Sequence, residues 1–116
     1  MKIRIKGNTL RYRLTRGDVE KLAATGLLEE HTEFTGKTLI YAIEAIADGK
    51  LSADFIDNRI VLKMPRQMIE ELNTTDKVGF DDHSGNVSLL VEKDFICIDN
   101  TMEDQSDNYP NPSLIC

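Results

Sequence analysis

The chain has 116 residues, of which 41% are hydrophobic and 29% charged, and this composition is typical of one globular domain with a single core. No apolar run approaches the ~18 residues of a membrane span, and the basic start 1–4 does not resemble a signal peptide. The net charge of −6 argues against general nucleic-acid binding. We therefore expect a cytoplasmic protein without a membrane or nucleic-acid partner.

Residues 1–14 predict a β-hairpin with one apolar and one basic face. Apolar and cationic residues alternate, as is typical of half-buried strands, and Gly7-Asn8 is suited to a tight turn. We call the cationic side the basic face. Its residues are Lys2, Arg4, Lys6, Arg11 and Arg13.

A short helix and two strands are expected next. Thr15 and Asp18 have the spacing of a capping box, and Gly26 is suited to end the helix. Strands are predicted at 28–34 and 38–47, separated by a glycine turn.

The second half of the chain predicts a similar succession of elements. Pro65 fits the first position of a second short helix. The other expected elements are a hairpin of strands 52–56 and 59–64, a short strand at 78–80, a polar turn at 81–86 and a strand at 87–92.

A shift of fifty residues aligns the two halves without a gap. Asn8 falls on Asn58 in both hairpin turns, and the helix starts and strand cores coincide as well. We infer two ββαββ units at about 2–47 and 52–97. The predicted fold is α+β, with eight short, mainly antiparallel strands and two short helices that form a barrel or two sheets. A barrel is slightly favoured, because closure removes exposed edges.

The predicted domain spans residues 1–99, and residues 100–116 form an acidic, proline-containing tail. Asp, Asn, Ser and Pro dominate the tail, so no regular element is expected there. Tyr109, Leu114 and Ile115 can still tether it to the core.

The basic face is confined to the first half of the chain. Under the fifty-residue shift, only Arg13 falls on another cation, Lys63. A requirement of the scaffold itself would apply to both halves. We therefore expect the basic face to contact an anionic ligand or an acidic protein surface. The candidates are the chain's own acidic run Glu103–Asp107, a second copy in a homodimer, or a separate partner.

Residues that can bind a metal or act as acid and base are also present. Glu29, His31 and Glu33 share one strand face, where a solvated surface is the simpler interpretation. The acidic run Glu103–Asp107 lacks the glycine of a calcium-binding loop. Zinc would need a regular ligand spacing such as CxxC, which is missing, so we expect no metal, cofactor or catalytic residue. The weak zinc candidates are Cys97, Asp99, Cys116 and His83.

The segments KIRIKGNTLRYRLT, VEKDFICID and EDQSDNYPNP resemble a family of small uncharacterised bacterial proteins, a domain of unknown function. This resemblance covers nearly the whole chain and implies no activity. A weaker, architectural resemblance is to the triphosphate-tunnel (CYTH) hydrolases, which are barrels that grip polyphosphate through inward cations. Their strand motif for metal binding, Glu-x-Glu-x-Lys, is not matched by Lys2-Ile-Arg4-Ile-Lys6.

Two functions are therefore open. The first is a small non-enzymatic binding or assembly domain that uses the basic face. The alternative is a polyphosphate- or nucleotide-processing hydrolase of the CYTH type. The missing acidic strand motif favours the first.

Overall fold

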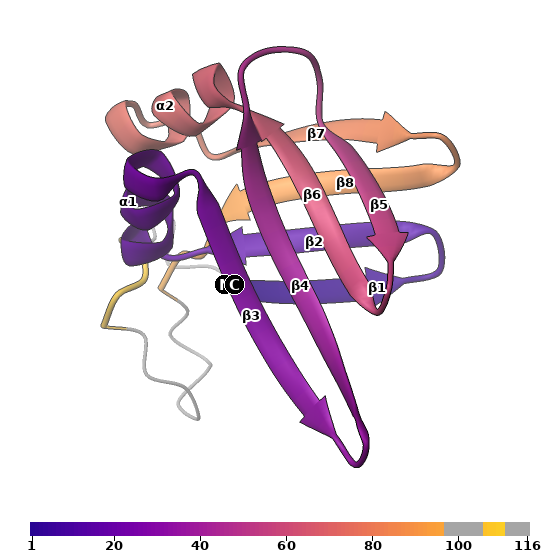
Figure 1. The fold of residues 1–116 in the computed structure, drawn as a ribbon. Helices are drawn as coiled ribbons and strands as arrows, with labels where there is room; N and C mark the ends of the chain where they lie inside the picture. Colours follow the sequence, from indigo (N-terminus) through magenta and orange to yellow (C-terminus); the bar gives the residue numbers. More distant parts are fainter. Residues whose placement is uncertain (97–105, 111–116) are drawn as a thin grey trace.

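The computed structural model describes residues 1–96 and 106–110. It confirms an α+β fold of eight strands and two short helices (Figure 1). The elements are β1 (Lys2–Lys6), β2 (Thr9–Leu14), α1 (Arg16–Thr25), β3 (Leu27–Phe34), β4 (Lys37–Ile46), β5 (Ser52–Ile56), β6 (Arg59–Pro65), α2 (Arg66–Thr74), β7 (Gly79–Ser84) and β8 (Val87–Lys93).

The strands form two sheets, so the expected preference for a barrel is wrong. Sheet A has the order β1-β2-β8-β7, and sheet B has the order β3-β4-β6-β5. Hairpin neighbours pair antiparallel, whereas β2 pairs with β8 and β4 with β6 in parallel. The strands of one sheet run across those of the other (Figure 1). Each sheet thus keeps two edges, which a closed barrel would remove.

Both halves contribute one hairpin to each sheet. The element order ββαββ is the same in both halves, and exchanging the halves converts the strand order of one sheet into that of the other. The parallel registers differ: Leu10 lies opposite Leu89, whereas Ile60 lies opposite Tyr41 rather than Leu39. Such a shift by two residues keeps the same side chains on the inner face. An internal duplication stays a prediction, which superposition of residues 3–42 on 53–92 would test.

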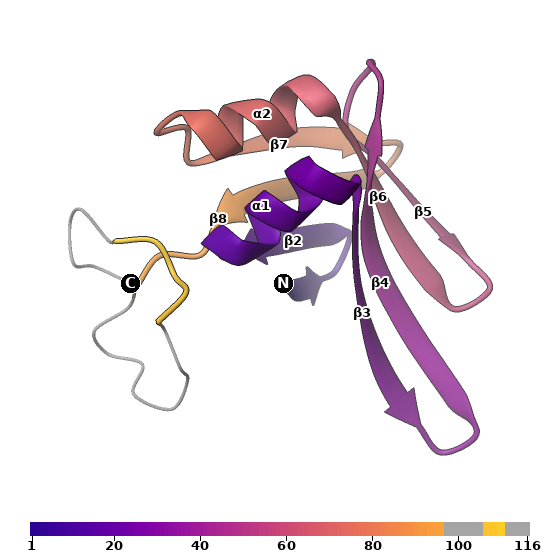
Figure 2. The ribbon, with the colours of Figure 1, turned by 60° about the vertical axis from the view of Figure 1, so that its left-hand side comes forward.

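The core lies between the two sheets and the helices, which lie side by side at one end (Figure 2). The apolar positions of the predicted strands and helices are the expected core, and burial confirms most of them. Leu10 is only partly buried, and Ile5 is 55% exposed because β1 is the edge strand of sheet A. The buried residues include Tyr12, Leu14, Val19, Leu22, Ile60, Leu62, Ile69 and Leu72.

Local sequence signals account for the start and end of α1. Thr15 accepts a hydrogen bond from the Asp18 backbone N–H (3.2 Å), and Asp18 accepts one from the Thr15 N–H (3.0 Å). This confirms the capping box. Gly26 ends the helix with φ of 77°, in the left-handed region that favours glycine.

The polar turn expected at 81–86 is wrong. Strand β7 continues to Ser84, and only Gly85-Asn86 forms the turn. Asp81 pairs with Leu90, and His83 pairs with Ser88. Pairing with β8 therefore outweighs the low strand propensity of these polar residues.

The segment 106–110 returns to the body of the protein. The Tyr109 N–H donates to the Asp94 carbonyl (2.9 Å), and the Tyr109 ring packs against the core. Tyr109 is therefore a tether, as expected from the sequence. Leu114 and Ile115 lie outside the described residues. The division at residue 99 between domain and tail stays a prediction. Within the described residues, no helix is long and apolar enough to cross a membrane.

Candidate functional site

The basic face occupies the outer side of sheet A at one edge. The two-residue turn Gly7-Asn8 sets the register of the hairpin, so Arg4 lies opposite Arg11 and Lys2 lies opposite Arg13. Like charges directly opposite each other on a sheet are destabilising. The structure therefore brings all five predicted cations together, and nearby anions would reduce the repulsion between them.

Strand β8 and the residue that follows it supply two such anions. Glu92 Oε1 lies 2.6 Å from Arg11 Nη2 and accepts a hydrogen bond from Arg11 Nε (2.7 Å). The same oxygen accepts from Arg13 Nε at 3.1 Å. Lys2 Nζ lies 2.9 Å from Oδ2 of the buried Asp94, as an ion pair without hydrogen-bond geometry. The sequence analysis did not identify Glu92 or Asp94 as partners of the basic face.

Two cations at the turn end of the basic face have no anionic partner among the described residues. Arg4 and Lys6 are exposed, and neither forms an ion pair with another residue in 1–96 or 106–110. Asp107, the one acidic residue of the run Glu103–Asp107 that the structure describes, accepts a hydrogen bond from the Gly17 N–H at the start of α1 (3.2 Å). Glu103 and Asp104 lie outside the described residues, so pairing of this run with the basic face stays a prediction. The part of the basic face around Arg4 and Lys6 is therefore the part available to an external anion.

Only one of the four weak zinc candidates lies in the described part of the chain, so the structure does not test this group. His83 is exposed on β7, and the other three candidates, Cys97, Asp99 and Cys116, lie outside the described residues. Over 1–96 and 106–110, no group of three or more His, Cys, Asp or Glu side chains is arranged to hold a metal ion.

The predicted acid–base face carries a network of charged side chains on the outer side of sheet B. Glu29 lies 2.8 Å from His31 Nε2 and accepts a hydrogen bond from Arg59 (3.2 Å), which also donates to Glu44 (3.0 Å). Hydrogen bonds from His31 and Arg59 lower the pKa of Glu29. Glu33 is exposed and lies outside this network. The Glu29 carboxylate is thus held in its ionised form, which suits an ion-pair network more than a proton donor.

Replacing Arg59 with glutamine should raise the pKa of Glu29 towards its ordinary value of 4.5, because one hydrogen bond and one positive charge are lost. In the native protein this carboxylate stabilises the fold above its ordinary pKa, and the contribution is lost as the pH falls through the lowered pKa. An NMR titration of the Glu29 side-chain carboxyl carbon measures the shift. Lys50→Gln is the control with the same charge change, and an equal pKa in Arg59→Gln and in the control would contradict the assignment.

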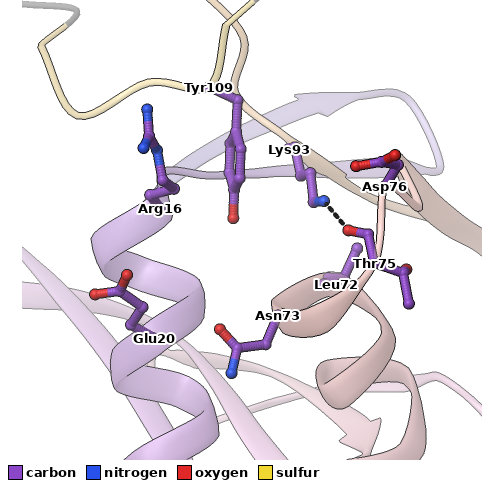
Figure 3. Close-up of a pocket in the computed structure, with 8 residues that line it drawn as sticks. All are labelled: Arg16, Glu20, Leu72, Asn73, Thr75, Asp76, Lys93 and Tyr109. Carbon is purple, nitrogen blue, oxygen red and sulfur yellow. Dashed lines mark hydrogen bonds between the residues drawn. The ribbon is translucent and has the colours of Figure 1, made fainter.

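A small cavity of about 200 Å³ lies where α1 begins and α2 ends (Figure 3). The buried Lys93 ammonium donates to the Thr75 carbonyl at the end of α2 (2.9 Å) and lies 4.9 Å from the Tyr109 ring centroid. Burial lowers the pKa of Lys93 and raises that of Tyr109. The cavity is lined by Arg16, Glu20, Leu72, Asn73, Thr75, Asp76, Lys93 and Tyr109.

Lys93 serves a structural role in this cavity. A cation at the C-terminus of a helix satisfies a free carbonyl and interacts favourably with the helix dipole. The same ammonium lies over the Tyr109 ring, which is favourable for a cation on an aromatic face. Two acidic groups, Glu20 and Asp76, balance the charges of Lys93 and Arg16 in the lining. Lys93 therefore links segment 106–110 to the end of α2. The lining of the cavity has no excess charge that would attract a charged ligand.

A family model described as a family of unknown function, DUF7009, matches residues 1–113. The chain belongs to this family. The match covers the basic face, both sheets and segment 106–110, and it confirms the resemblance to a domain of unknown function. No curated protein and no solved structure matches the DUF7009 chain. The resemblance to CYTH hydrolases is not supported.

Proposed function

We propose that this DUF7009 chain is a small, non-enzymatic binding domain that takes an acidic protein surface on its basic face. The observation that carries the proposal is the charge imbalance on the outer side of sheet A. Two carboxylates, Glu92 and Asp94, face five cations among the described residues, and Arg4 and Lys6 stay exposed. Arginine side chains suit carboxylate partners, because their planar fork can donate two parallel hydrogen bonds.

The geometry supports a binding surface better than a polyphosphate hydrolase. A triphosphate tunnel requires cations that point into a closed barrel. In this protein the cations point outward from an open four-stranded sheet. A broad, open surface suits another macromolecule, because a small ligand is normally held in a concave site that buries most of its surface. We place this activity in the cytoplasm, where Cys97 and Cys116 stay reduced.

The double variant Arg4→Gln/Lys6→Gln tests the proposal. These two cations have no ion pair within 1–96 and 106–110, so their removal should leave the fold intact. Addition of poly-glutamate at low salt should raise the melting temperature of the native protein by several degrees, because a ligand that binds only the folded state stabilises it. The variant should lose most of this shift.

The matched control is Lys21→Gln/Lys50→Gln, which makes the same change in net charge elsewhere on the protein. This control should respond to poly-glutamate like the native protein. Equal responses of the two double variants would contradict the proposal, since only overall charge would then matter. A response to inorganic polyphosphate or ATP without one to poly-glutamate would replace the acidic protein surface with a phosphate ligand.

A further inference from the structure

Strand β1 presents a backbone edge that no described strand covers, beside the basic face. It is the outermost strand of sheet A, and no other strand of the described residues pairs with its far side. The Ser88 N–H of β8 donates to the carbonyl of Asn8, just before β2, and the N–H of Asp94, just after β8, donates to the Leu14 carbonyl. The backbone N–H and C=O groups of the even-numbered residues of β2 therefore point towards β8. Because the ladder alternates, the odd-numbered residues of β2 bond to Lys2, Arg4 and Lys6. The N–H and C=O groups of Ile3 and Ile5 therefore point to this edge.

The two sides of this edge differ in chemistry. The outer side carries Arg4 and Lys6, whereas Ile5 lies on the inner side and is 55% exposed. The β3–β4 hairpin extends past β1 in both views (Figures 1 and 2). Its inner side carries Phe34, which is 61% exposed, on the same face as the buried Leu28. A strand added to β1 would therefore meet cations on one side and apolar groups on the other.

Charge selects what can pair with this edge. Two copies of the chain joined through β1 would bring their Arg4 and Lys6 side chains close together, which is unfavourable. Cationic side chains on edge strands protect natural sheets from such self-association. An acidic strand would instead be attracted to this edge, because its carboxylates would lie beside Arg4 and Lys6. Electrostatic repulsion thus disfavours pairing of this edge with a second copy, and electrostatic attraction favours pairing with an acidic segment.

We propose that β1 docks an extended segment of a partner protein in which acidic and apolar residues alternate. Such a segment adds a fifth strand to sheet A through main-chain hydrogen bonds to Ile3 and Ile5, as in other cases of strand addition. Its acidic side chains face Arg4 and Lys6, and its apolar side chains face Ile5 and the extended hairpin. This inference rests on the proposed function, because the basic face supplies the positive charge that attracts the partner. It adds that the partner segment is extended and that its acidic and apolar residues alternate.

The test uses the full chain and a synthetic probe, the acetylated and amidated peptide SEVEVES. A block peptide of the same composition, EEESSVV, has the same charge without the alternation. Two further versions of the probe carry N-methyl groups, either on the valines or on the glutamates. Only one edge of an added strand faces β1, so one N-methylated version should bind at least tenfold more weakly, while the other binds like the unmodified peptide. The block peptide should also bind at least tenfold more weakly.

The outcomes separate this inference from the proposed function. If both N-methylated versions bind like the unmodified peptide, strand addition is wrong, whereas the binding role of the basic face stands if Arg4→Gln/Lys6→Gln still weakens binding. Equal loss in both versions would also contradict addition at a single edge. If neither the peptides nor poly-glutamate bind, both proposals fail.

Discussion

Replacing Leu22 with alanine should lower the free energy of unfolding by roughly 2–5 kcal/mol, the usual range for a buried leucine. Leu22 lies in α1 and is 0% exposed, in the cluster that joins both helices to both sheets. The helix has only 10 residues and is therefore marginal without tertiary packing. A cavity at this position removes apolar contacts between α1 and the core.

Urea denaturation of the native protein and the variant measures this change. Leu27→Ala is the matched control, because the same atoms are removed from a side chain that is 39% exposed. We expect the control to lose less than about 1 kcal/mol. A loss below about 1 kcal/mol in Leu22→Ala itself would show that the core is not organised as described.

Replacing Gly79 with alanine should also destabilise the fold, by about 1–3 kcal/mol or more, the range for overpacking of a tightly packed site. Gly79 begins β7 and lies opposite Glu92 of β8. An added methyl group would collide with the Val91 carbonyl oxygen and lie 2.9 Å from the Glu92 Cα atom. Both obstacles are backbone atoms, so β8 itself must move.

This second prediction links stability to the site. Strand β8 pairs with β2 and β7, and its Glu92 holds Arg11 and Arg13 on the basic face. Thermal unfolding of Gly79→Ala beside Asp81→Ala, an exposed position of the same strand, measures the effect. We expect Asp81→Ala to stay within about 0.5 kcal/mol of the native protein. A similarly small change in Gly79→Ala would contradict the close approach of the two strands.

Local patterns in the sequence were sufficient to predict most of the elements. Alternation of apolar and charged residues placed β1 and β2 and the outward direction of their five cations. The reciprocal spacing of Thr15 and Asp18 placed the start of α1. These features depend on neighbouring residues, whose geometry follows directly from the periods of strands and helices.

Features that depend on distant residues could not be predicted in this way. Glu92 lies 81 residues from Arg11 in the sequence, and only the parallel pairing of β2 with β8 brings the two together. The antiparallel pairing of β7 with β8, a different contact, extends β7 through polar residues that were predicted as a turn. Ile5 has the alternation of a buried residue, but its exposure follows from the edge position of β1, which no local pattern reveals.

The most direct test of the binding proposal is an NMR titration of the isotope-labelled chain with a ten-residue glutamate peptide. We predict that the shifts of the amide signals concentrate on β1 and β2, with the largest at Arg4, Lys6 and Arg11, and that added salt reverses them by screening the charges. A titration that moves no signals in β1 and β2, or moves mainly those around Lys50 and Lys77, would contradict the proposal that the basic face binds acidic partners.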